Sequence, residues 1–144
     1  MIELLYFASQ IQCSADSSLL NIEVDVYHQQ KLVQTMSLND KATVNVASVN
    51  DLNFEYRAVG DNATCDLTAP TEKTLKSDTA LPDLDGIYNQ SSIQNLLSNS
   101  DKYEELFLVE LGTTDSDSSA FDMQDVVFKV DNDPDITVAT IFAD

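Results

Sequence analysis

The sequence predicts an all-β protein, an antiparallel β-sandwich of jelly-roll-like type with one short helix. Apolar and polar residues alternate with a period of two in several short segments, which is the pattern of half-buried strands. Turn-forming residues separate these segments at short, regular intervals, as they do in sandwiches and barrels. The pattern leaves open whether the sheet closes as a barrel, and we expect the sandwich.

The chain of 144 residues fits a single domain, residues 1–144. A domain of this size buries about two thirds of its unfolded surface, which is enough for a hydrophobic core without metals or disulfides. Residues 66–88 show no sustained periodicity and contain Pro70, Pro82 and Gly86. A linker between two small domains would leave each half with too little core, so we expect this segment to be a surface loop of one domain.

The strand pattern is clearest in residues 20–27. The apolar side of this strand consists of Leu20, Ile22, Val24 and Val26. A short reversal leads into residues 32–38, which predicts an antiparallel hairpin with Leu32, Met36 and Leu38 on one face. The other strands predicted in this half are residues 4–12, 43–49 and 52–59. Because these strands follow one another so closely, we expect a meander.

The second half contains one predicted helix and two apolar runs. Ser91 or Ser92 is expected to cap a helix that ends near Asn99. Residues 106–111 and 126–130 are short apolar runs typical of buried strands. A terminal strand is predicted at residues 136–142, with Ile136, Val138 and Phe142 on one face.

The charge of the chain excludes some classes of partner. There are 25 acidic and 7 basic residues, a net charge of −18, and 18 of the acidic residues are Asp. Such a charge repels nucleic acid and anionic membrane surfaces, so we expect neither as a partner. It permits cations, basic proteins or a high-salt environment, and a solvated acidic surface is its simplest interpretation.

An acidic loop between the two apolar runs is the candidate metal site. Its carboxylates are Asp115, Asp117, Asp122 and Asp125. Ca²⁺ takes six to eight oxygen ligands, so closely spaced Asp side chains are the residue type that it requires. The EF-hand pattern is absent, which predicts an irregular site with a Kd on the order of 10⁻⁴ to 10⁻³ M. The alternative is that these Asp residues cap turns through their own backbone.

A second acidic cluster follows the second apolar run. It consists of Asp131, Asp133 and Asp135. Here turn formation is the favoured interpretation, because Pro134 by itself accounts for a turn.

Residues 121–128, Phe-Asp-Met-Gln-Asp-Val-Val-Phe, follow the Asp-rich loop. This segment resembles the acidic loop and following strand of secreted bacterial calcium-dependent β-sandwich modules, some of which bind carbohydrate. The resemblance implies that Asp115, Asp117, Asp122 and Asp125 bind Ca²⁺. Such modules commonly stack sugars on aromatic side chains. This chain has no Trp, so sugar binding would have to use Tyr or Phe.

Cys13 and Cys65 are the only cysteines, so in an oxidising compartment they can form a single disulfide. That bond would stabilise the fold by roughly 4 kcal/mol in the chain-entropy model. The alternative is a pair of buried free thiols.

The first residues do not resemble a signal peptide, because they lack Lys and Arg and include Glu3. No run approaches the about 20 apolar residues that a membrane span needs. We therefore expect a mature domain without its signal peptide, located outside the cell or on its surface.

The sequence offers no catalytic set. His28 is the only histidine and lies at the predicted hairpin turn, and the two Cys and one His cannot form a zinc site. Carboxylate pairs suited to glycoside hydrolysis are abundant, but the chain is small for a polysaccharide cleft.

We expect a non-catalytic, calcium-stabilised module that binds a glycan or a protein. The alternatives are an acidic nucleic-acid mimic that occupies a basic protein, and a virion or appendage subunit.

Overall fold

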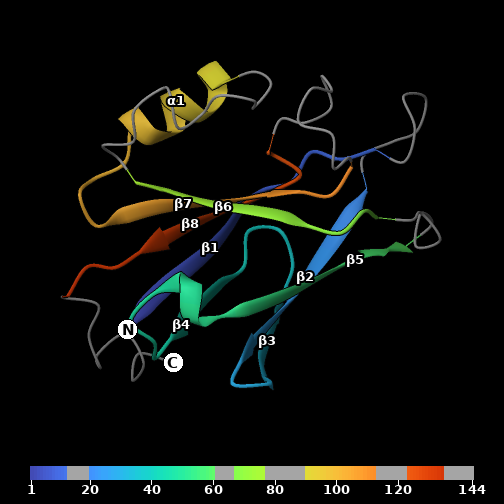
Figure 1. The fold of residues 1–144 in the computed structure, drawn as a ribbon, viewed down its shortest axis with the longest axis horizontal. Coiled ribbons are helices and arrows are strands. Elements are labelled where there is room, and N and C mark those ends of the chain that lie inside the picture. The colour runs from blue at the N-terminus through green and yellow to red at the C-terminus, as the bar shows by residue number, and fades with distance from the viewer. Residues whose placement is uncertain (13–19, 61–66, 77–89, 113–122, 135–144) are drawn as a thin grey trace.

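The computed structural model describes residues 1–12, 20–60, 67–76, 90–112 and 123–134. In this part of the chain two antiparallel β-sheets pack face to face, and one helix covers the outer face of the larger sheet (Figure 1). The predicted antiparallel β-sandwich with one short helix is confirmed.

The strands and helices of the described part of the chain are short. They are β1 (Ile2–Ala8), β2 (Asn21–His28), β3 (Lys31–Met36), β4 (Lys41–Val44), the 3-10 helix η1 (Val49–Asp51), β5 (Asn53–Val59), β6 (Thr71–Lys76), α1 (Gln90–Ser98), β7 (Glu104–Glu110) and β8 (Val126–Asp131). One sheet has the strand order β4-β1-β8-β7-β6 and the other has the order β3-β2-β5.

The main core lies between the two sheets. Inward positions of β2 alternate as predicted, with Ile22, Val24 and Val26 buried against the larger sheet. The Phe54 ring of β5 crosses the interface, because its centroid lies 4.8 Å from that of Phe107 on β7 and 5.6 Å from that of Phe128 on β8. Ring pairs at these distances stabilise the sandwich beyond the area that they bury.

A second core lies on the opposite face of the larger sheet, beneath α1. Ile93 and Leu97 of the helix pack there with Leu106 and Leu108 of β7 and with Val127 of β8. These two strands are therefore buried on both faces, which explains why the sequence shows them as continuous apolar runs without alternation.

The predicted meander is wrong. After the hairpin of β2 and β3, the chain crosses to the larger sheet as β4, which pairs with β1. It then returns as β5, which pairs with the free side of β2. Alternation identifies the buried face of a strand but not its neighbour in the sheet, so the sequence pattern could not reveal this crossing.

The predicted surface loop at residues 66–88 contains a strand, so that expectation is also wrong in part. Thr71–Lys76 forms β6, which pairs with β7 at the edge of the larger sheet. Its residues are mostly polar and only Leu75 is buried, as expected for an edge strand with solvent on several sides. Residues 77–89 lie outside the described part of the chain.

The predicted apolar face of β3 is wrong for two of its three residues. The hairpin forms, but its register shifts between Val26 and Tyr27, and Leu32 is 55% exposed. Leu38 lies beyond the end of β3 and is 48% exposed, while Met36 is buried. Gln29 and Gln30 both have positive φ, 52° and 67°, as a type I′ turn requires.

Several element boundaries differ from those expected. The first strand ends at Ala8 and not at residue 12, and the predicted strand at residues 43–49 ends at Val44 and is followed by η1. Helix α1 begins at Gln90, before both serines that were expected to cap it. The strand predicted at residues 136–142 lies outside the described residues.

Candidate functional site

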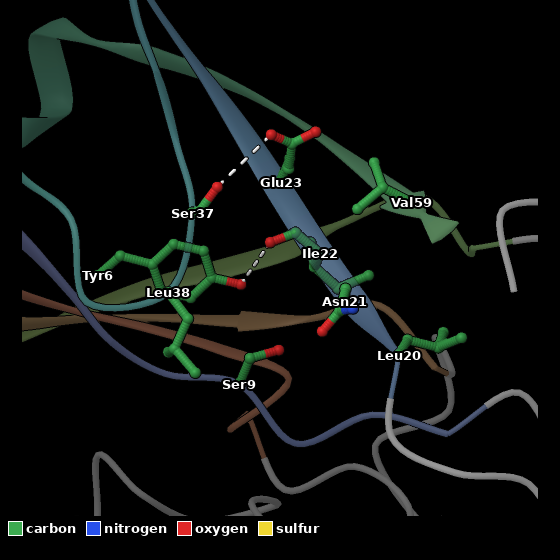
Figure 2. Close-up of a pocket in the computed structure, with 9 residues that line it drawn as sticks. All are labelled: Tyr6, Ser9, Leu20, Asn21, Ile22, Glu23, Ser37, Leu38 and Val59. Carbon is green, nitrogen blue, oxygen red and sulfur yellow. Dashed lines mark hydrogen bonds between the residues drawn. The ribbon is translucent and has the colours of Figure 1, made fainter. Parts of the chain in front are cut away.

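A cavity of about 520 Å³ lies beside the first residues of β2 in the described part of the chain. Figure 2 shows side chains from β1, β2 and the link between β3 and β4 around it. Its polar lining residues are Tyr6, Ser9, Asn21, Glu23 and Ser37. Leu20, Ile22, Leu38 and Val59 supply the apolar part of the wall.

The cavity exists because β3 is shorter than β2. Their pairing ends where Met36 faces Val24, and the chain then turns at residues 37–40 toward the larger sheet. The turn is fixed by the Ser37 amide, which donates to Asp40 Oδ2 at 2.8 Å, and by the Asn39 amide, which donates to the Tyr6 carbonyl at 2.8 Å. The start of β2 consequently has β5 on one side and the cavity on the other.

Tyr6 joins the two sheets at the cavity. Its hydroxyl donates to the Ile22 carbonyl at 2.8 Å, and its side chain is fully buried. Burial raises the pKa of the Tyr6 phenol, and a hydrogen bond with Ser9 partly offsets this effect. The phenol is thus neutral at physiological pH, where it acts as a hydrogen-bond donor and not as a base.

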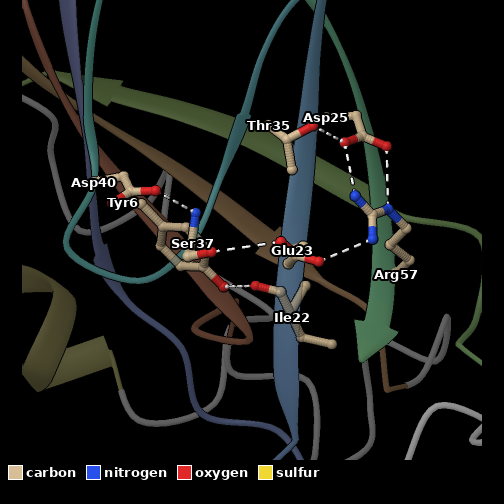
Figure 3. Close-up of polar contacts among 8 residues, drawn as sticks. All are labelled: Tyr6, Ile22, Glu23, Asp25, Thr35, Ser37, Asp40 and Arg57. Carbon is tan, nitrogen blue, oxygen red and sulfur yellow. Dashed lines mark hydrogen bonds and ion pairs between the residues drawn. The ribbon is translucent and has the colours of Figure 1, made fainter. Parts of the chain in front are cut away.

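Glu23 presents a carboxylate at the cavity that is held from two sides. Its Oε1 lies 2.9 Å from Arg57 Nη1, and its Oε2 lies 3.5 Å from the Ser37 hydroxyl, a long contact (Figure 3). The Arg57 guanidinium also donates to both oxygens of Asp25, at 3.1 and 3.2 Å. The orientation of Glu23 is therefore set by Arg57, which is itself fixed by a bidentate contact.

Asp25 completes this network on the outer face of the three-stranded sheet. Thr35 Oγ1 donates to Asp25 Oδ1 at 2.6 Å, from the neighbouring strand β3. The hydrogen bonds from Arg57, and then that from Thr35, hold the pKa of the Asp25 carboxyl below its ordinary value. Arg57 and Asp25 thus form an ion pair beside Glu23.

The cavity is connected to the base of the acidic loop. Ser9 lines the cavity, and its hydroxyl donates to the Asp125 carbonyl at 2.8 Å. Asp125 itself is only 4% exposed, and its Oδ2 accepts from the amides of Leu111 and Gly112 at 2.7 and 2.9 Å. The last residue before β8 is in this way tied to the two residues that follow β7.

Glu110 is the second buried carboxylate of this region, with an exposed fraction of 0%. Its Oε2 accepts from the Gly112 amide at 2.8 Å and its Oε1 from the Met123 amide at 3.3 Å. We call Glu110 and Asp125 the loop clasp, because together they bind backbone amides on both sides of residues 113–122. The clasp fixes the two ends of the acidic loop relative to each other.

Glu110 was not among the site residues predicted from the sequence. No local signal distinguished it, because Glu104 and Glu105 at the other end of the same strand are only partly buried.

Of the four predicted metal ligands, the structure describes one. Asp125 is in the clasp, where it accepts backbone hydrogen bonds, while Asp115, Asp117 and Asp122 lie outside the described residues. Within the described ranges, no group of three or more His, Cys, Asp or Glu side chains is arranged to hold a metal ion.

The other predicted site residues can be placed only in part. Asp131 Oδ1 accepts from the Asp133 amide at 2.8 Å, which is the geometry of an Asx turn, and Asp135 is not among the described residues. Cys13 and Cys65 also lie outside them, so their disulfide stays a prediction.

The described segments contain no helix that has both the length and the apolar character of a transmembrane span. Comparison of the chain with protein-family models, with curated proteins and with solved structures found no match.

Proposed function

We propose that the chain is a non-catalytic binding module that takes a small polyhydroxylated ligand, such as the terminal sugar of a glycan, in the cavity beside β2. The cavity itself is the observation that carries the proposal. Its volume of about 520 Å³ falls within the range of small-molecule sites, roughly 300 to 1,000 Å³. Its wall combines a carboxylate, hydroxyls and a carboxamide with apolar side chains, as expected for a ligand that has both hydroxyl groups and C–H faces.

The Glu23 carboxylate and the Tyr6 hydroxyl are held in place before a ligand arrives. Arg57 fixes Glu23, so this carboxylate could accept hydrogen bonds from two sugar hydroxyls with little loss of side-chain entropy. Ser37 and Asn21 lie beside it as further donors and acceptors. Leu38 is 48% exposed at the cavity and offers the apolar contact that a sugar ring needs in place of a tryptophan.

Ca²⁺ is proposed to stabilise the module through Asp115, Asp117 and Asp122, whose carboxylates are close in sequence. The loop clasp supports this proposal, because it anchors both ends of the segment that carries these residues. The hydrogen bond from Ser9 to Asp125 would couple the binding of Ca²⁺ in the loop to the position of Ser9 in the cavity wall. Such a module would act outside the cell or on its surface.

A glycan array followed by calorimetric titration of the best monosaccharide or oligosaccharide tests the proposal. Glu23→Gln and Leu38→Ala should each weaken binding about tenfold, since about 1.4 kcal/mol is lost with one charge-assisted hydrogen bond or one apolar contact. The matched control is Glu55→Gln, which removes an exposed carboxylate of the same sheet that does not line the cavity. Unchanged affinity in Glu23→Gln, or the absence of any glycan ligand, would overturn the proposal.

The net charge of −18 favours a second candidate, an acidic mimic of nucleic acid that occupies a basic protein. Its binding would weaken steeply with salt, whereas glycan binding in the cavity would change little. The redox state of Cys13 and Cys65 also distinguishes the glycan-binding module from the nucleic-acid mimic. A disulfide in the native protein favours the extracellular module, and two reduced thiols favour an intracellular mimic.

A further inference from the structure

The large apolar side chains that are exposed in the described part of the chain all lie on or shortly after one strand. They are Leu32 and Val33 of β3, which are 55% and 42% exposed, and Leu38. Leu38 lines the cavity beside β2, but Leu32 and Val33 do not. The proposed ligand site therefore leaves the exposure of these two residues unexplained.

β3 is the last strand of the smaller sheet. It pairs with β2 on one side and has no further strand on the other among the described residues (Figure 1). Edge strands usually oppose association by carrying charged side chains, above all Lys. β3 has only Lys31, which is followed at once by the two exposed apolar residues. The edge of the sheet thus presents an apolar strip to solvent.

The same edge lacks negative charge. Residues 26–39 contain neither Asp nor Glu, although the chain has 25 acidic residues. Two copies of the chain, each with a net charge of −18, repel each other. That repulsion is weakest where acidic side chains are absent, because Coulomb energy falls with the distance between the charges. A second copy can therefore approach most closely at β3.

The two ends of the strip carry opposite charges. Lys31 lies at its start and Asp40 in the turn that follows it, and both are exposed. The Asp40 carboxylate is fixed by the Ser37 amide, which donates to its Oδ2 at 2.8 Å. A twofold dimer requires a surface that is complementary to itself. A strip with a positive end, an apolar centre and a negative end meets this requirement when the second copy runs antiparallel.

We propose that two copies of the chain form a dimer through antiparallel contact of their β3 edges. Val33 of each copy lies near the twofold axis with Leu32 beside it, and Lys31 of each copy approaches Asp40 of the other. The register of β3 shifts beside Val26, which interrupts regular strand geometry, so the contact is made by side chains and not by a continuous ladder. An interface this small gives a weak dimer, with a Kd roughly between 1 µM and 1 mM.

Analytical ultracentrifugation of the full chain tests the proposal. The weight-average mass should rise toward that of two chains as the concentration is increased to about 1 mM. Raising NaCl from about 0.05 to about 0.5 M should strengthen association, because salt screens the repulsion between two acidic copies. A chain that stays monomeric under all these conditions would overturn the proposal and leave the β3 edge to a different protein. Association that weakens with salt would overturn an apolar contact.

Val33→Asp tests the position of the twofold axis. It places two like charges close together in the dimer, so it should weaken association at least tenfold. The Tm should fall by a few degrees at most, because Val33 is exposed in the single chain. The matched control is Asn53→Asp, which adds the same charge at an exposed position of β5, on the opposite edge of the same sheet. Equal Kd values for the two variants would contradict a dimer through β3.

A charge exchange tests the antiparallel orientation. Lys31→Glu and Asp40→Lys should each weaken self-association about fivefold or more, because each substitution brings like charges together at both ends of the interface. An equimolar mixture of the two variants should recover the affinity of the unsubstituted chain to within about threefold, since each end of the mixed dimer again joins opposite charges. Thermal unfolding of each variant confirms that it is folded. A mixture that associates no better than either variant alone would rule out the antiparallel dimer.

Discussion

Glu110 and Asp125 each place a carboxylate oxygen on the same backbone amide, that of Gly112, at 2.8 and 2.9 Å. Both side chains are buried, and they come from opposite ends of the acidic loop. The two ends of that loop are thereby fixed by the protein's own backbone amides. This arrangement separates the role of Asp125 in the fold from the proposed role of Asp115, Asp117 and Asp122 in binding Ca²⁺.

Asp125→Asn should lower the free energy of unfolding by about 1 to 3 kcal/mol, because the carboxamide replaces charge-assisted bonds to two buried amides with weaker ones. Glu110→Gln should have a similar effect. Urea denaturation at pH 7 measures both, with the exposed Glu55→Gln expected to change stability by less than about 0.5 kcal/mol. A fully stable Asp125→Asn would show that the clasp does not hold the loop.

Alanine substitutions at Gly112 and at Gly60 should both lower the stability of the protein, but for different reasons. A Cβ at Gly112 would lie 3.2 Å from Glu110 Oε2 and 3.5 Å from Asp125 Oδ2, so Gly112→Ala should displace the clasp. Gly60 has open space but a φ of 83°, so Gly60→Ala should cost about 1 kcal/mol through backbone strain. Because Asn tolerates this conformation, Gly60→Asn should restore part of the loss in thermal unfolding. The same recovery in Gly112→Asn would argue against a steric cause there.

Tyr6→Phe should destabilise the sandwich by about 1 to 3 kcal/mol, since it leaves the Ile22 carbonyl without this buried bond and keeps the ring packing unchanged. Chemical denaturation checks the value, and Tyr27→Phe on the outer face is the control. A loss confined to ligand binding, with no change in stability, would show that the hydroxyl does not help to join the sheets.

The ion pair of Arg57 and Asp25 should make stability fall in acid. The pKa of Asp25 in the folded protein lies below its ordinary value of 3.8, so the pair stabilises the fold fully above that value. This contribution is lost as the pH falls through the lower, folded-state pKa. Arg57→Met should therefore flatten the decline in unfolding free energy below about pH 4, while costing about 1 kcal/mol or less at pH 7, since Arg57 is 47% exposed. If the unfolding free energies of the unsubstituted protein and of Arg57→Met fall in parallel as the pH is lowered, this linkage is ruled out.

Ca²⁺ should stabilise the protein against heat through the acidic loop. For a site with a Kd of about 0.1 mM, about 10 mM Ca²⁺ adds roughly 2.7 kcal/mol, a Tm shift of several degrees relative to excess EDTA. The same concentration of Mg²⁺ controls for charge screening, and a variant with Asp115→Asn and Asp117→Asn should lose the difference. Equal small shifts with both cations would leave screening as the explanation and remove the metal from the proposed function.

The sequence by itself determined the fold class and the buried face of most strands. Ile22, Val24 and Val26 alternate with polar residues, and this local period of two follows from strand geometry whatever the neighbouring strand is. The runs in β7 and β8 were recognisable as buried strands for a related reason, because burial on both faces removes polar positions.

Only the tertiary structure decided which strands are neighbours and where the candidate site lies. The crossing of β4 to the larger sheet, the pairing of polar β6 with β7 and the exposure of Leu32 depend on contacts between residues far apart in sequence. The cavity forms because β3 leaves β2 at Met36, and Glu110 is buried because Gly112 and Met123 are brought to it. A local pattern specifies which side of a strand is apolar, but the register and order of strands arise from the packing of the whole chain.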